Sequence, residues 1–158
     1  MIEFSFTLPE PESPWHTTWD RVQQVNTADI SEMDLRYKHF GVRAQLTIND
    51  VEVISNRGFI TLVDLALSVS WVGKCLAAGE DSAFNFTEGA EVIRLHVEGD
   101  RIAMSSSVKP WATSVAREQL LEAFAELRNE AHACLTARVP GIADHPVIRR
   151  FAPDQAGS

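Results

Sequence analysis

Residues 42–54 read VRAQLTINDVEVI, and apolar and polar side chains alternate on both sides of a central Asn-Asp pair. One side of the extended chain carries the apolar residues Val42, Ala44, Leu46 and Ile48. Alternation with a period of two predicts a half-buried β-strand. Asn49 and Asp50 both tolerate the left-handed backbone of a tight turn. The stretch therefore predicts a β-hairpin whose second strand returns over residues 51–54.

A helix is predicted directly after this hairpin, over residues 61–78. Thr61 and Asp64 resemble a capping box at its start, and Gly79 suits its end. Its apolar residues are Leu62, Val63, Leu65, Ala66, Leu67, Val69, Trp71, Val72 and Leu76. A helix that is apolar on most sides is usually buried. We therefore expect it to lie across the sheet as the centre of the core, with Trp71 inside.

Further strands are predicted on both sides of this central unit. Residues 1–8 alternate as a strand, and prolines then stop it. A short helix is expected over 14–25 and a polar loop over 26–34. After the central helix, residues 84–86, 93–97 and 102–104 read as three strands. Glu98-Gly99-Asp100 predicts the hairpin turn between the last two of them.

A second long helix is predicted over residues 114–138, with Thr113 or Ser114 as its N-cap. Its apolar face lies opposite a row of glutamates, and Pro140-Gly141 ends it. The expected fold is therefore α+β: an antiparallel sheet of five to six strands packed by two main helices, at 61–78 and 114–138. Residues 1–151 are expected to form one domain, followed by a flexible tail over 152–158.

The composition excludes several classes of protein. Apolar residues make up 45% of the 158 and the formal net charge is -8, which is typical of a globular chain that does not bind nucleic acid. No apolar run is long enough to span a membrane, and the N-terminus lacks the basic start of a signal peptide. We expect a cytoplasmic protein. Cys75 and Cys134 are expected to be reduced, buried thiols, with a bridge between them left open.

The most distinctive pattern is a row of carboxylates along the second long helix. The row consists of Glu118, Glu122, Glu126 and Glu130. Residues four apart share one helical face, and like charges at that spacing destabilise a helix by about 0.2–0.5 kcal/mol per pair. Arg117 and Arg128 fall outside the row. Water, a basic neighbour in the fold or a basic partner must accommodate this charge. Glu98 and Asp100 at the hairpin are added to the candidate partner-binding residues.

Catalytic patterns are missing from the sequence. It contains no Gly-x-Ser-x-Gly, P-loop or dinucleotide-binding motif, and its histidines have no metal-ligand spacing. We therefore predict no enzymatic activity, no cofactor and no metal. One alternative is a ligand pocket between sheet and helices, with Arg94, His96 and Ser105 as its polar groups. As a general base, His96 would need an orienting partner and a cleft, and a surface strand histidine is the preferred interpretation.

The tryptophans leave a further alternative open. Trp15, Trp19 and Trp111 lie beside prolines or at the start of a predicted helix, so each is a candidate interface anchor or an edge of the core. A homo-oligomer joined through the region of Trp15 and Trp19 is one possibility. Its mark would be a symmetric, apolar interface between two copies.

Residues 42–107 resemble small bacterial immunity-type proteins, which neutralise toxins of neighbouring cells. The resemblance is carried by the Val-x-Ala-x-Leu-x-Ile strand, the Leu62–Leu76 helix, the Phe84-x-Phe86 strand and the hairpin of Ile93-x-Leu95 and Ile102-x-Met104. It implies a non-enzymatic cytosolic protein that binds one toxin domain, and it transfers no functional residue. The acidic composition is compatible with a basic toxin domain as the partner.

Overall fold

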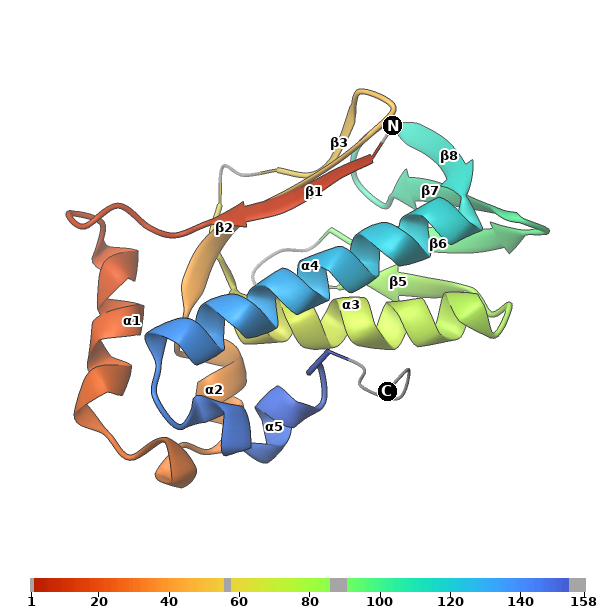
Figure 1. Cartoon of the computed structure of the whole chain (residues 1–158). Helices are drawn as coiled ribbons and strands as arrows, with labels where there is room; N and C mark the ends of the chain where they lie inside the picture. Colours follow the sequence, from red (N-terminus) through yellow and green to blue (C-terminus); the bar gives the residue numbers. More distant parts are fainter. Residues whose placement is uncertain (1, 56–57, 86–90, 154–158) are drawn as a thin grey trace.

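The computed structural model describes residues 2–55, 58–85 and 91–153. Their strands form two four-stranded antiparallel sheets, and two long helices pack side by side against them (Figure 1). The α+β class predicted from the sequence is confirmed. The prediction of one sheet with five to six strands is wrong, because the strands before and after the central helix belong to different sheets.

The first sheet contains the hairpin from which the sequence analysis began. β1 (Ile2–Thr7), β2 (Gly41–Ile48) and β3 (Val51–Ile54) are neighbours in that order, and the short β4 (Ile60–Thr61) pairs with the start of β2. Asn49 and Asp50 adopt φ values of 50° and 68°, which is the left-handed turn that their residue types predicted. The apolar positions of β2 are fully buried, so this hairpin is confirmed.

The second sheet is a meander of β5 (Ser82–Phe84), β6 (Ile93–Glu98), β7 (Arg101–Ser106) and β8 (Ala112–Ala116). Its buried side carries large apolar residues, among them Phe84, Leu95 and Met104. β8 was not predicted, because its sequence ATSVA offers one large apolar side chain, Val115, instead of a clear alternation. Phe86, which was expected to extend the first of these strands, lies outside the described residues.

The unpredicted strand β8 also corrects the start of the second long helix. Thr113 and Ser114 lie in β8 and cap nothing, and α4 (Arg117–Arg138) follows directly with Ala116 at its N-cap position and no side-chain cap. Arg117 donates its backbone N–H to the carbonyl of Asp100 at 2.7 Å, so the β6–β7 turn satisfies one exposed donor of the first turn. The helix end near residue 138 is confirmed.

The central helix α3 (Leu62–Ala77) was placed correctly, but two of its details were not. Thr61 occupies the N-cap position, but its side chain makes no capping hydrogen bond. Its hydroxyl donates to the carbonyl of Arg36, while Asp64 accepts from Arg36, so the predicted capping box is wrong. Trp71 is 66% exposed and does not lie in the core. At the other end, Gly79 has φ of 80° and closes the helix as predicted.

The segment before β2 folds into short helical turns around Trp19. These are α1 (Thr17–Asp20), α2 (Glu32–Tyr37) and 3-10 turns at Pro14–His16, Arg21–Gln24 and Thr27–Asp29. Trp19 is buried and donates its indole N–H to the carbonyl of Gly41 at 2.9 Å, while Trp15 stacks on Phe59. The short helix near 14–25 is confirmed, and the loop predicted over 26–34 is wrong where α2 begins.

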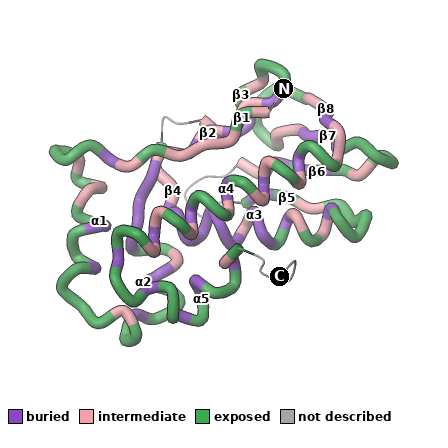
Figure 2. The backbone as a smooth tube through the Cα atoms, in the orientation of Figure 1, coloured by how far each residue is buried: buried purple, intermediate pink, exposed green. Residues whose placement is uncertain are grey.

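One aromatic side chain of α4 joins the layers of the core. Phe124 meets Phe4 of β1 and Phe84 of β5 edge-on, with ring centroids 5.9 and 5.8 Å apart. Both sheets therefore pack against the same side of α4. Burial alternates around this helix, as Figure 2 shows, with Leu120, Phe124, Leu127, Ala131 and Leu135 as its buried residues. This apolar face was predicted.

The last elements in the described residues are a 3-10 turn at Ile142–Asp144 and α5 (Pro146–Arg149), whose N-cap is His145. Residues 154–158 of the predicted tail lie outside the described residues. Cys75 and Cys134 are free and half-buried, so their expected full burial is wrong. No helix in the described ranges is long and apolar enough to cross a membrane.

Candidate functional site

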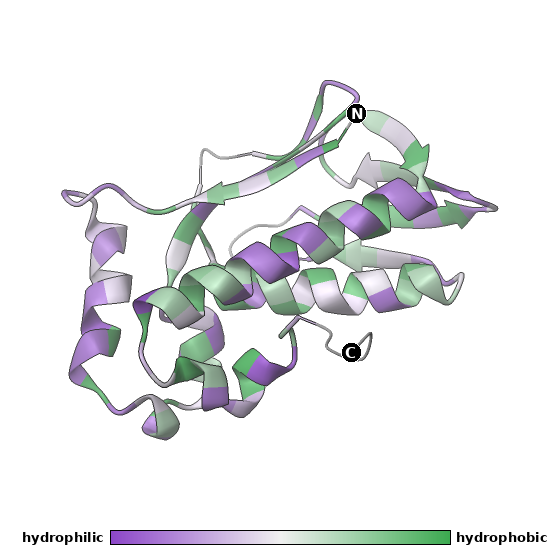
Figure 3. Cartoon of the chain, viewed as in Figure 1, coloured by the Kyte–Doolittle hydropathy of each residue, from purple (hydrophilic) through white to green (hydrophobic). Residues whose placement is uncertain are grey.

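The four glutamates of α4 form one exposed face, which we call the acidic face and define as Glu118, Glu122, Glu126 and Glu130. All four are exposed, whereas the buried residues of α4 lie on the opposite side. Hydrophilic residues accordingly line the near side of α4 in Figure 3, above the more hydrophobic α3. The structure thus brings the predicted carboxylates together on one side of a single rigid element.

No basic side chain of the described ranges forms an ion pair with the acidic face. Arg128 lies on α4 but turns toward α3, where it lines a hollow together with Lys74 and Phe124. In this part of the chain, no basic neighbour within the fold therefore balances the negative charge. Water or a basic partner must accommodate it.

The β6–β7 turn lies against the first turn of α4. The backbone hydrogen bond from Arg117 to Asp100 fixes this contact, so Asp100 lies next to the start of the acidic face. Glu98 precedes the turn and is exposed, but it pairs in register with Arg101 on the neighbouring strand. Asp100 thus lies beside the start of the acidic face, and Arg101 lies opposite Glu98; the partner-binding role of both acidic residues stays a prediction.

His96 has an orienting partner that the sequence did not reveal. Its Nδ1 lies 2.7 Å from Oδ2 of Asp81, whose Oδ1 accepts the backbone N–H of Val97 at 2.8 Å. The hydrogen bond and charge of Asp81 raise the pKa of His96, and the Val97 N–H and His96 lower the pKa of Asp81. Only the strand register, with Ser82 opposite Leu95, places this pair together, so sequence spacing gave no signal.

The three residues of the alternative pocket share the outer side of the second sheet. Arg94 pairs in register with Ser105, and His96 follows two residues along β6. A hollow of about 550 Å³ is lined by Asp81, Arg94 and His96 but not by Ser105. Arg94 and His96 are exposed on an open strand surface, so the residues do not converge in an enclosed pocket between sheet and helices.

A second candidate site was missed by the sequence analysis. A cleft of about 480 Å³ runs along α3 and is lined in part by Arg36, Ser68, Trp71, Lys74, Asn85 and Arg150. We call this the Trp71 cleft. The available signal was a large aromatic residue beside Ser68, Ser70 and Lys74 on an otherwise apolar helix. Arg36 and Arg150 come from distant segments, and no local pattern connects them to it.

Groups of three or more His, Cys, Asp or Glu side chains that could hold a metal ion do not occur among the residues that the structure describes. The arrangement instead offers two charged surfaces, one acidic on α4 and one basic beside α3. Comparison of the chain with protein-family models, with curated proteins and with solved structures gave no match.

Proposed function

We propose that this chain is a binding protein of the toxin-neutralising immunity type, and that it binds a basic toxin domain through the acidic face of α4. The observation that carries the proposal is the exposure of four carboxylates on consecutive turns, without an ion pair among the described residues. Such a row destabilises its own helix, and a basic partner would convert that cost into attraction.

The packing of α4 supports a role as a preformed surface. Five residues of the opposite face are buried, and Phe124 fixes the helix against both sheets. The backbone under the carboxylates is therefore held in place before any partner arrives. Binding to a preorganised surface loses less conformational entropy than binding to a mobile one.

The net charge of -8 supports the same proposal, because it would raise the rate at which the chain encounters a basic protein. An acidic surface steers a basic protein toward itself over several ångströms, and salt weakens this steering. We expect Asp100 to add to the field at the start of α4, since the β6–β7 turn lies there. The chain would neutralise its partner by covering the active site of the toxin or by blocking its assembly.

The test compares three tagged proteins in pull-downs from the native cell lysate at low and high salt. They are the wild-type chain, a variant with all four residues of the acidic face changed to Gln, and a control with the same charge change elsewhere. The control changes four exposed carboxylates outside α4, Glu10, Glu12 and Glu80 to Gln and Asp29 to Asn.

A basic protein that the wild type and the control retain at low salt, and that the acidic-face variant loses, is the expected result. With that partner purified, the variant should show a slower association rate and a weaker salt dependence. Expression of the partner alone should then harm cells, and coexpression with this chain should protect them. Equal capture by all three proteins, or a captured partner that harms no cell, contradicts the proposal.

A further inference from the structure

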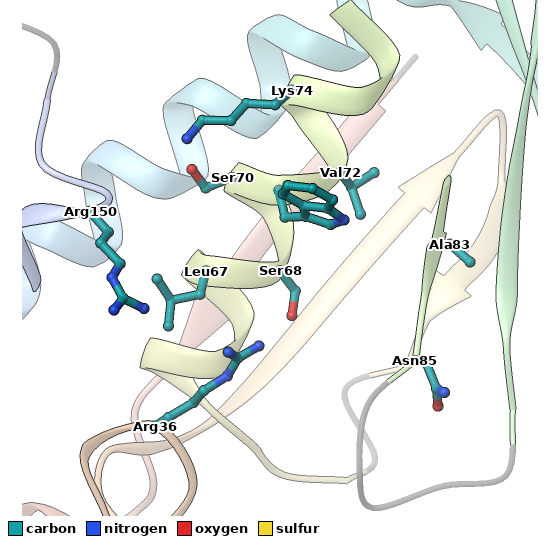
Figure 4. A pocket seen from close by; sticks show the side chains of 10 residues that line it. Arg36, Leu67, Ser68, Ser70, Val72, Lys74, Ala83, Asn85 and Arg150 are labelled. Carbon is teal, nitrogen blue, oxygen red and sulfur yellow. The ribbon is translucent and has the colours of Figure 1, made fainter. Parts of the chain in front are cut away.

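The Trp71 cleft lies beside α3 and combines groups from four parts of the chain. Arg36 comes from α2 and Lys74 from α3, while Asn85 and Arg150 are the residues that follow β5 and α5. In Figure 4 Lys74 and Arg150 lie on one side of α3, Arg36 lies near the start of the helix, and Ala83 and Asn85 lie across the cleft. Its volume of about 480 Å³ falls within the range of about 300–1,000 Å³ that is usual for small-molecule sites.

Trp71 gives the cleft an aromatic surface. Its side chain is 66% exposed although ten of the sixteen residues of α3 are buried. Lys74 follows one turn later on the same side of the helix. An exposed indole beside cations is an unusual choice for a surface helix, since tryptophan is among the most buried residue types on average. It offers a face on which a planar ring can stack.

Three cations line the cleft together with Trp71, in a chain of net charge -8. Arg36 uses its Nε to bind Asp64 at 2.7 Å, and Arg150 uses one Nη to bind Glu32 at 2.7 Å. These ion pairs orient both guanidinium groups, and each group has further N–H donors. Lys74 has no carboxylate within ion-pair distance in the described part of the chain. The positive charge of Lys74 is therefore not balanced by a carboxylate, unlike the charges of Arg36 and Arg150.

We propose that the Trp71 cleft binds a small aromatic anion of the nucleoside-phosphate class. The planar base stacks on Trp71, and the phosphate lies among Lys74, Arg150 and Arg36. Guanidinium and ammonium groups are the usual ligands of phosphate, and Ser68 and Asn85 provide hydrogen bonds for the remaining polar atoms. The net negative charge favours a small ligand over a nucleic-acid strand, whose many phosphates the acidic surface repels.

This site is separate from the acidic face and does not depend on the function proposed above. The Trp71 cleft lies beside α3, carries positive charge and would bind a small anion, whereas the acidic face lies on α4 and would bind a basic protein. A chain that fails to bind a basic protein can still bind a nucleotide, and the reverse also holds.

The experiment is calorimetric titration of the whole chain with adenosine monophosphate, adenosine and inorganic phosphate at two salt concentrations. Two variants test the two halves of the site: Trp71→Ala, with Trp71→Phe as its rescue, and Lys74→Gln combined with Arg150→Gln. The matched control combines Lys38→Gln with Arg149→Gln, which removes two exposed positive charges outside the cleft. Arg36 is left unchanged because it balances the buried Asp64. Circular dichroism checks that each variant is folded.

Adenosine monophosphate should bind once per chain and more tightly than adenosine or phosphate alone. We expect Trp71→Ala to weaken it about tenfold or more, as loss of one stacked base does, and Trp71→Phe to recover most of this loss. The Lys74 and Arg150 variant should weaken it about tenfold and reduce its salt dependence, and the control should match the wild type. NMR shifts of the Trp71 indole N–H should follow the same titration.

Three results would overturn the proposal. The first is no heat and no NMR shift with adenosine monophosphate at millimolar concentration. The second is phosphate binding that equals nucleotide binding and ignores Trp71, which would make the cleft a plain anion site. The third is a single-stranded oligonucleotide that binds far more tightly than the mononucleotide.

Discussion

The two long helices lie side by side and use their surfaces in opposite ways. Ten of the sixteen residues of α3 are buried, whereas α4 buries five of twenty-two. The open side of α3 carries Trp71 and Lys74 and borders a basic cleft, while the open side of α4 carries four glutamates. A helix that contributes most to the core can thus still line the larger hollow, of about 480 Å³, whereas Glu122 and Glu126 of the acidic face line one of about 240 Å³.

The largest expected difference between the helices concerns two aromatic side chains. Phe124→Ala on α4 should lower the free energy of unfolding by about 3–5 kcal/mol, because the ring is 3% exposed and touches Phe4 and Phe84. Trp71→Ala on α3 should cost about 0.5 kcal/mol or less, since its side chain is mostly in solvent. Urea unfolding of both variants measures this. Similar losses would mean that α3 is buried on all sides, as its sequence suggested.

A smaller difference in the free energy of unfolding is expected between variants of the two arginines of the Trp71 cleft. Arg36→Met should cost about 2–3 kcal/mol, because it leaves Asp64, whose side chain is 7% exposed, without its cation. Arg150→Met should cost about 0–1 kcal/mol, since both side chains of its ion pair are half-exposed. Thermal and urea unfolding compare them. Adding Asp64→Leu to Arg36→Met should recover part of the loss, and no recovery would show that Arg36 stabilises by packing alone.

Sequence periodicity correctly predicted the helices and strands that bury one face and expose the other. The β2–β3 hairpin, the extent of α3 and the buried face of α4 all follow from spacing and turn residues. The same reasoning failed for β8, where small and polar residues hide the alternation. It also failed for the division into two sheets. The division depends on which strands pair with each other after the central helix. Strand pairing is a long-range property that local sequence patterns do not reveal.

The candidate site could be predicted only where one helix holds all of its residues. The acidic face has a period of four, so its common orientation was readable from the sequence. Asp81 and His96, or Arg36 and Arg150 beside Trp71, meet through register and tertiary packing. The tryptophans show the same limit. Helical spacing predicted that Trp71 lies in the core, but it is exposed. Trp19, which the sequence left as either an interface anchor or an edge of the core, is buried.

A weaker effect tests whether the acidic face is uncompensated. Glu122→Lys replaces two repulsive pairs, with Glu118 and Glu126, by two attractive ones, so it should stabilise the chain by about 0.8–2 kcal/mol at low salt. Salt near 1 M should remove most of this gain. Glu12→Lys, an exposed change outside α4, is the control and should have little effect. Destabilisation by Glu122→Lys would reveal a basic neighbour of this carboxylate within the fold.

The smallest effect concerns a histidine on the acidic helix itself. His132 packs edge-on against Phe151 with centroids 6.1 Å apart, and burial lowers its pKa below the ordinary 6.5. Its contribution to stability should therefore be present above pH 6.5 and be lost as the pH falls through the folded pKa. His96 should behave in the opposite sense, because Asp81 raises its pKa: its contribution is present below pH 6.5 and is lost as the pH rises through the folded pKa.

An NMR titration of the imidazole signals measures both histidines in one sample. Asp81→Asn should move the pKa of His96 back toward 6.5 and leave that of His132 unchanged, since only His96 contacts this carboxylate. A pKa of His132 above 6.5 would mean that the field of the four glutamates outweighs burial against Phe151. The acidic face would then act across α4 itself, and the separation between its charged and its buried side would be weaker than the packing indicates.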